Sequence, residues 1–225
     1  MSLNEQIRES IASFRENLPP ELVSLIEQGA GEISAMAIVE HAINVGDKVP
    51  DFTLKDRNGS YRSLTEYLTD GPLVITFYRG VWCPFCNMQL AAYNAVLNDI
   101  HATGAQLVAI TPETENAMEV LAQSNAPSEA KESAKRVVDF DILHDAKTEV
   151  ARKFGLVFEL PSSHKRLLDM LSFDVERANG DNSYAFADPA TYVVGADGFV
   201  KWAFVPNNYR KRAEPEDILK ALNNI

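Results

Sequence analysis

The 225-residue sequence contains little cysteine and histidine, which limits the sites it can build. Its two cysteines, Cys83 and Cys86, are too few for a disulfide framework, and a structural zinc site needs four ligands. The four histidines are scattered, with no pair at metal-ligand spacing. The glycine-rich phosphate-binding motifs of dinucleotide-binding and P-loop proteins are also missing. We therefore expect no metal ion and no other cofactor.

Positive charge is in deficit as well, with 21 Lys and Arg against 32 Asp and Glu, a net charge of −11. This balance argues against a nucleic-acid partner, whose binding depends on basic side chains that neutralise phosphates. The first residues lack the apolar core of a signal peptide, and apolar runs such as Leu73–Tyr78 are too short to cross a bilayer. We expect no membrane partner and a cytoplasmic location, where a cysteine pair is more often catalytic or metal-binding than structural.

The N-terminal residues 1–45 are predicted to form a helical extension. Leu3–Leu18 repeats apolar residues at spacings of three and four, which is typical of one face of a helix. A second helix is predicted over Glu21–Gln28, where Gly29 and Gly31 end it, and a weaker third over Ser34–Ala42. So short a segment seldom supports its own core, so we expect it to dock on the following domain or to form a homodimer contact.

Residues 46–225 are predicted to form one α/β domain. The pattern of two buried strands around a helix over Pro84–Thr103 predicts a β-α-β crossover with a parallel strand pair. A polar loop is expected around Pro127–Lys135, and an Asp-Gly turn predicts a C-terminal hairpin. The predicted strands are residues 52–54, 61–64, 73–78, 106–111, 140–143, 191–194 and 199–205. The further predicted helices are residues 113–125, 147–154, 163–175 and 215–222.

A Cys-x-x-Cys motif lies directly after a buried strand and at the start of a helix. Pro84 suits the first helical turn, which places Cys83 near the N-cap and Cys86 near the third helical residue. Free backbone N–H groups and the positive end of the helix dipole then favour the thiolate, and the second sulfur can close on the first. The alternatives are a zinc half-site and two inert core cysteines.

Three further segments carry a family resemblance. Val45–Leu54, Phe77–Cys86 and His144–Lys147 followed by Phe154–Leu156 resemble the opening, the peroxidatic loop and a later segment of the AhpC/TSA peroxiredoxins. The resemblance covers about residues 46–225, within the thioredoxin-fold superfamily. It implies a thioredoxin-like fold, with a mixed central sheet flanked by helices, and a thiol peroxidase activity.

The sequence departs from that family at its catalytic motif. Peroxiredoxins carry Pro-x-x-x-Thr-x-x-Cys, and here the final Cys is Cys86, while Cys83 and Arg79 stand at the Thr and Pro positions. Gln89 stands where the family often has Glu or Gln. The family's later Arg falls at about Pro189, a place where thioredoxins have a cis-proline packed against their Cys-x-x-Cys. The sequence therefore combines a peroxiredoxin scaffold with a thioredoxin-type site.

Two neighbouring residues are candidates to shape the site. Arg79 is a candidate to stabilise the thiolate in place of the missing Arg, and the alternative is an exposed or salt-bridged strand-end residue. Trp82 either shields the sulfurs and shapes a partner groove or only packs.

The main functional hypothesis is reduction of hydrogen peroxide or alkyl hydroperoxides by the Cys83–Cys86 dithiol. The resulting disulfide is recycled by a thioredoxin- or glutathione-type reductant, and either cysteine is a candidate for the first attack. The alternatives are a thioredoxin-like disulfide reductase, with Cys83 attacking a disulfide substrate, and a non-catalytic redox sensor.

Overall fold

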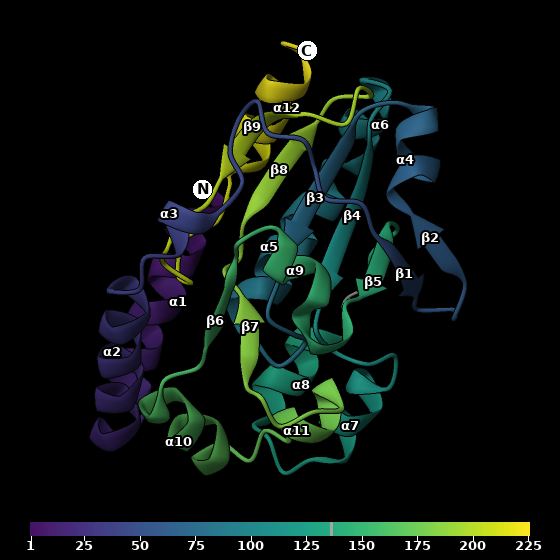
Figure 1. Ribbon diagram of the computed structural model, residues 1–225. Coiled ribbons are helices and arrows are strands. Elements are labelled where there is room, and N and C mark those ends of the chain that lie inside the picture. The colour runs from purple at the N-terminus through teal and green to yellow at the C-terminus, as the bar shows by residue number, and fades with distance from the viewer. Residues whose placement is uncertain (136) are drawn as a thin grey trace.

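A seven-stranded mixed sheet forms the centre of the computed structural model, which describes residues 1–135 and 137–225 (Figure 1). The strand order is β2-β1-β5-β4-β3-β8-β9. Strands β3, β4 and β5 are parallel to one another, and the remaining pairs are antiparallel. The strands are β1 (Thr53–Asp56), β2 (Tyr61–Ser63), β3 (Leu73–Phe77), β4 (Gln106–Thr111), β5 (Asp141–His144), β8 (Thr191–Val194) and β9 (Val200–Phe204).

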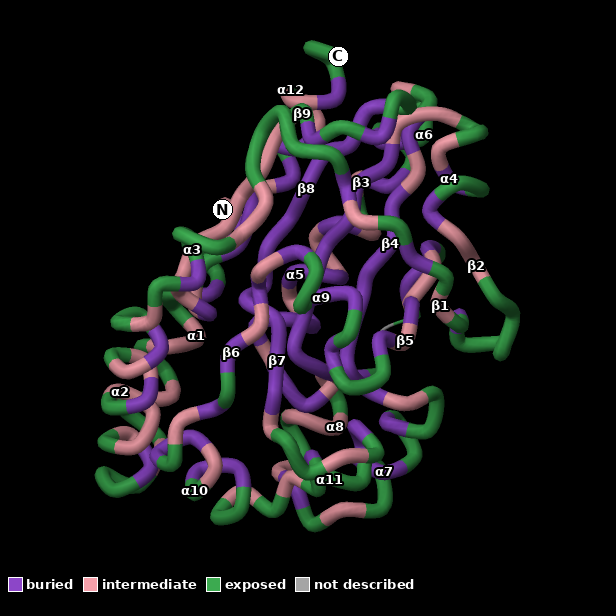
Figure 2. Tube along the Cα trace, in the orientation of Figure 1, coloured by how far each residue is buried: buried purple, intermediate pink, exposed green. Residues whose placement is uncertain are grey.

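The middle of this sheet is the core of the protein. All five residues of β3 are buried, as are the last five of β4, because both strands are nearly continuous apolar runs with helices on their faces (Figure 2). The predicted parallel pair β3–β4 is confirmed. Its connection is two helices, α5 (Pro84–Ala95) and α6 (Leu97–Ala102), instead of the one predicted helix, since the chain leaves helical geometry at Val96.

The remaining elements show where sequence patterns were misleading. The segment predicted as a polar loop contains helix α8 (Ser128–Ala134), because its Ala, Glu and Lys residues are good helix formers. Strands β6 (Val157–Glu159) and β7 (Ala185–Ala187) form a separate two-stranded sheet that was not predicted. The C-terminal hairpin β8–β9 is confirmed. The other helices are α4 (Leu64–Asp70), α7 (Ala117–Gln123), α9 (Glu149–Lys153, after a 3-10 turn at Ala146–Thr148), α10 (Ser162–Met170), α11 (Val175–Asn179) and α12 (Pro215–Leu222).

The N-terminal segment is helical and docks on its own chain. It contains α1 (Leu3–Asn17), α2 (Pro20–Ser34) and the short α3 (Ile38–His41). Helix α1 packs on α5, and α2 lies beside α10 along one side of the molecule (Figure 1). The prediction that glycines end the second helix is wrong, since α2 continues through Gly29 and Gly31 to Ser34. The division of the chain near residue 45 into extension and domain stays a prediction.

The segment Pro20–His41 is long and apolar enough to cross a membrane by length and composition. No such segment was expected from the sequence. Only 28% of its most apolar window is buried, and a helix that packs on the core of a water-exposed protein meets the same criterion. In the structure it packs against α10, and its Glu27 forms an ion pair with Arg210 at 3.1 Å.

The two glycines of α2 offer a matched pair of substitutions. A Cβ at Gly29 would lie 1.6 Å from Nδ1 of the buried His164 ring, whereas a Cβ at Gly31 meets nothing within 4 Å. We expect Gly29→Ala to lower the free energy of unfolding by about 1–3 kcal/mol through overpacking. Gly31→Ala should raise it by about 0.5–1 kcal/mol through helix propensity. Urea unfolding measures both, and equal effects would contradict the packing of α2 on α10.

Candidate active site

The two cysteines meet at the N-terminus of α5. Cys83 is the N-cap residue, Pro84 is the first helical residue and Cys86 lies in the first turn. The Cys86 thiol donates to the Cys83 sulfur, and the two Sγ atoms are 2.8 Å apart. Both cysteines are unbonded and 0% exposed. The dithiol is therefore positioned to form a disulfide within one helical turn.

A guanidinium group contacts each sulfur. Arg79, in the loop after β3, donates from Nη2 to Cys83 Sγ at 3.2 Å. Arg212, between β9 and α12, donates from Nη2 to Cys86 Sγ, also at 3.2 Å. The two arginines are only 3% and 0% exposed, so their charges act on the sulfurs with little screening by water. The site is a pair of buried cations around a dithiol.

These contacts separate the acidities of the two thiols. Burial raises the pKa of Cys83, but the hydrogen bond from Cys86 and the charges of Arg79 and Arg212 outweigh it and hold that pKa well below its ordinary value. Burial, the same hydrogen bond and the Cys83 charge raise the pKa of Cys86 well above its ordinary value. The pair therefore holds one proton near neutral pH, with the negative charge on Cys83.

Arg212 is held by a network that the sequence did not reveal. Its Nε donates to Gln89 Oε1, and its Nη1 donates to the backbone oxygens of Tyr209 at 2.6 Å and Lys211 at 2.7 Å. Gln89 in turn donates from Nε2 to Thr76 Oγ1 at 2.6 Å, which links the network to β3. The sequence feature that could have indicated Arg212 is the basic cluster Arg210–Arg212, which stands out in an acidic chain just after the predicted hairpin.

Pro189 does not have the expected conformation. The peptide bond before it is trans, so the thioredoxin-type cis-proline prediction is wrong. Pro189 is buried in the segment that leads into β8, where the next residue, Ala190, accepts a hydrogen bond from the Phe77 N–H. The dithiol still has a cation beside Cys86, because Arg212 reaches it from a loop farther along the chain.

Aromatic rings lie against the Arg79 guanidinium group. The Arg79 guanidinium carbon lies 4.2 Å from the centre of the Tyr209 ring and 5.0 Å from that of Trp82. The Tyr209 hydroxyl is 3.1 Å from His164 Nε2. Burial, together with the charges of Arg79 and Arg210, lowers the pKa of His164 to about 3, so this ring is neutral. Trp82 is 6% exposed, and its ring packs against Arg79, the cation that contacts Cys83.

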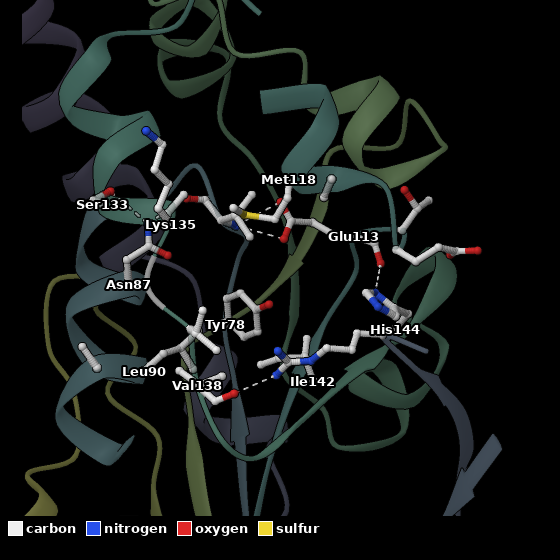
Figure 3. Close-up of a pocket in the computed structure, with 18 residues that line it drawn as sticks. Tyr78, Asn87, Leu90, Glu113, Met118, Ser133, Lys135, Val138, Ile142 and His144 are labelled. Atoms are coloured by element: carbon white, nitrogen blue, oxygen red, sulfur yellow. Dashed lines mark hydrogen bonds between the residues drawn. The ribbon is translucent and has the colours of Figure 1, made fainter. Parts of the chain in front are cut away.

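A buried carboxyl group supports the loop before Cys83. The Val81 N–H donates to both carboxyl oxygens of Glu113, at 2.9 and 3.0 Å. Burial outweighs the hydrogen bond from Val81 and raises the pKa of Glu113 to about 8. Glu113, Tyr78 and Asn87 line a cavity of about 230 Å³ (Figure 3). The cavity therefore borders Val81 and Asn87, which are close to both cysteines in the sequence.

Metal chemistry has no obvious ligand set here. Within residues 1–135 and 137–225, no group of three or more His, Cys, Asp or Glu side chains is arranged to hold an ion. The side chains that contact the two sulfurs are arginines, and their positive charges repel a metal ion.

Comparison with known proteins identifies relatives of this sequence. The sequence model of the AhpC/TSA family matches residues 45–203. A Mycobacterium tuberculosis protein provisionally named a peroxiredoxin is 29% identical over 114 residues, which are 51% of this chain and 67% of that protein. The chloroplastic peroxiredoxin Q of Gentiana triflora is 28% identical over 128 residues, which are 56% of this chain and 53% of that protein.

Solved structures show the same fold. The peroxidoxin BcpB of Mycobacterium tuberculosis aligns with a TM-score of 0.57 and 23% identity, over 81% of this chain and 98% of that one. The reduced 2-Cys peroxiredoxin of Plasmodium vivax aligns with a TM-score of 0.59 and 15% identity, over 80% of this chain and 81% of that one. With the match to residues 45–203, which is well over half of the sequence, these findings establish that the chain belongs to the AhpC/TSA family.

Proposed function

We propose that this protein is a thiol peroxidase that reduces hydrogen peroxide or alkyl hydroperoxides through the Cys83–Cys86 dithiol. The observation that carries the proposal is the pair of sulfurs 2.8 Å apart, each contacted by a buried guanidinium group. A thiolate is the nucleophile that attacks peroxides, and buried cations stabilise both the thiolate and the negative charge that develops on the peroxide oxygens.

The charge distribution favours Cys83 as the first nucleophile. Its thiolate attacks one peroxide oxygen, the O–O bond breaks, and Cys83 becomes a sulfenic acid. The Cys86 thiol gives its proton to the leaving alkoxide or hydroxide, which departs as alcohol or water. The Cys86 thiolate, beside Arg212, then attacks the Cys83 sulfur, expels hydroxide and forms the disulfide. Hydroxide takes up the proton lost when Cys83 ionised, so the cycle consumes two thiols and one peroxide.

The buried position of the dithiol affects how its substrates reach it. Both sulfurs are 0% exposed, so a hydroperoxide, and later a thioredoxin- or glutathione-type reductant, reaches them only when a neighbouring segment moves. We further propose that this cycle takes place in the cytoplasm, where such reductants are abundant.

Disulfide reduction is the less favoured activity. That hypothesis depended on the missing Thr, whose position Cys83 takes, on a missing arginine and on Pro189. Arg212 now stands beside Cys86, and the bond before Pro189 is trans. A homodimer formed through the N-terminal helices stays a prediction, because α1 and α2 pack on α5 and α10 of the same chain but leave much of the apolar segment Pro20–His41 unburied.

Serine substitutions distinguish the roles of the two sulfurs. We expect Cys83→Ser to abolish rapid reaction with peroxide. Cys86→Ser should still react once and leave a sulfenic acid on Cys83 that dimedone traps, because the resolving thiol is gone. Stopped-flow rates and mass spectrometry measure both outcomes. The reverse pattern would assign the first attack to Cys86, and wild-type protein that reacts no faster than free cysteine would contradict the peroxidase proposal itself.

Lysine substitutions test the arginines. Lysine keeps the charge but lacks the planar fork, so Arg212→Lys cannot contact Cys86, Gln89 and two carbonyl groups together. We expect kcat/KM for hydrogen peroxide to fall about 100-fold in Arg212→Lys, the usual loss for one donor to a developing anion, and similarly in Arg79→Lys. Lys211→Ala, which removes an exposed side chain next to Arg212, is the control and should leave the rate unchanged.

The pH dependence follows from the low pKa of Cys83. The rate with peroxide should rise with pH through this pKa and level off well below the range in which free cysteine ionises. Because the folded-state pKa lies below the unfolded value, this thiolate stabilises the fold, and the stabilisation is lost as pH falls through the folded-state pKa. Ultraviolet absorbance of the thiolate measures the titration, and a single step at the ordinary cysteine pKa would contradict it.

A further inference from the structure

The loop that carries Arg212 is held in place by helix α1. Residues 205–214 between β9 and α12 contain neither helix nor strand. The Arg212 N–H donates to Asn4 Oδ1 at 3.0 Å, and Asn4 Nδ2 donates to the Arg212 carbonyl oxygen at 2.8 Å. One side-chain amide thus binds both main-chain groups of Arg212, which sets the position and the orientation of its backbone.

A second contact fixes the same loop to the start of α1. The Glu214 carboxylate accepts hydrogen bonds from the N–H groups of Leu3, at 2.8 Å, and Asn4, at 2.9 Å. These N–H groups have no partner within the helix, and the positive end of the helix dipole adds to the attraction. Partial burial raises the pKa of Glu214, but the hydrogen bonds from Asn4 and Leu3 outweigh it and keep the carboxylate ionised.

Helix α1 is in turn anchored on the helix that bears the cysteines. It packs on α5, where the Phe14 and Phe85 rings have centroids 6.1 Å apart, and Ile7 is 0% exposed. Helix α2 adds the ion pair between Glu27 and Arg210. The N-terminal helices therefore connect the cysteine helix to the loop that delivers Arg212.

We infer that Asn4 is a positioning residue for the peroxidase reaction, acting through the backbone of Arg212 to hold its guanidinium against Cys86. This inference rests on the proposed function of the dithiol. It assigns part of the active site to the N-terminal helical extension, outside residues 45–203 that match the family. Asn4 contacts neither the sulfurs nor their substrate, so its effect depends on Arg212.

Full-length Asn4→Ala is the test, with Asn17→Ala as the matched control on the same helix. Asn17 bonds only within its own helix, to Ser13, and is exposed. Alanine favours the helix, so neither change weakens α1 by itself. Asn4→Ala removes both hydrogen bonds to the Arg212 backbone and a third to Glu214. We expect it to slow the reaction with hydrogen peroxide about tenfold and to move the thiol titration to higher pH. Asn17→Ala should change neither.

A double-mutant cycle separates positioning from general destabilisation. In an Arg212→Lys background, Asn4→Ala should change the rate with hydrogen peroxide and the acid dissociation constant of the thiol by less than about twofold each. The reason is that the guanidinium group that Asn4 positions is gone. Equal effects in both backgrounds would overturn the inference. No shift of the thiol titration in Asn4→Ala would also overturn it.

The readouts also distinguish this inference from the proposed function. If the wild-type protein did not reduce peroxide, the peroxidase proposal would fail. The thiol titration would still report the coupling between Asn4 and Arg212.

Discussion

The site depends on the electrostatic relation between two buried guanidinium groups and one thiolate. Arg79 and Arg212 are withdrawn from water, and burying a cation is costly unless an anion lies beside it. The dithiol supplies that anion by losing one proton, which makes the sulfur reactive and offsets the cost of burying the cations. Other contacts, including Gln89 below Arg212 and the Tyr209 ring beside Arg79, keep these charges within reach of sulfur.

Much of the fold was predictable because its signals are local. The apolar runs of β3 and β4 and the periodic stripe of α1 specify their own secondary structure. The sequence predicts a loop in place of helix α8, because the segment is highly polar. Its Ala, Glu and Lys residues nevertheless favour a helix. Strands β6 and β7 have three residues each, too few for a recognisable alternation. Gly29 predicts a helix end, but α2 continues through it. Its missing side chain leaves room for the His164 ring, a contact that forms only in the folded chain.

The candidate site likewise has a local part that the sequence predicts and a distant part that it does not. Cys83, Pro84 and Cys86 form a local motif, so their arrangement at a helix N-terminus could be expected from the sequence. Arg212 could not be located by local patterns, because it reaches Cys86 across 126 residues. The family pattern indicated that an arginine was missing at one position, whereas the chemistry requires only that a guanidinium reach the sulfur, from any part of the chain.

The span of sequence between the parts of this site affects when it becomes complete. Asn4 and Arg212 are 208 residues apart, so the ribosome makes Asn4 long before Arg212. Until the loop of residues 205–214 emerges, α1 lacks its acidic cap and Cys86 lacks its cation. The dithiol therefore keeps a more ordinary acidity during this part of synthesis, and the charge separation of the folded site develops only after that loop has folded back onto α1.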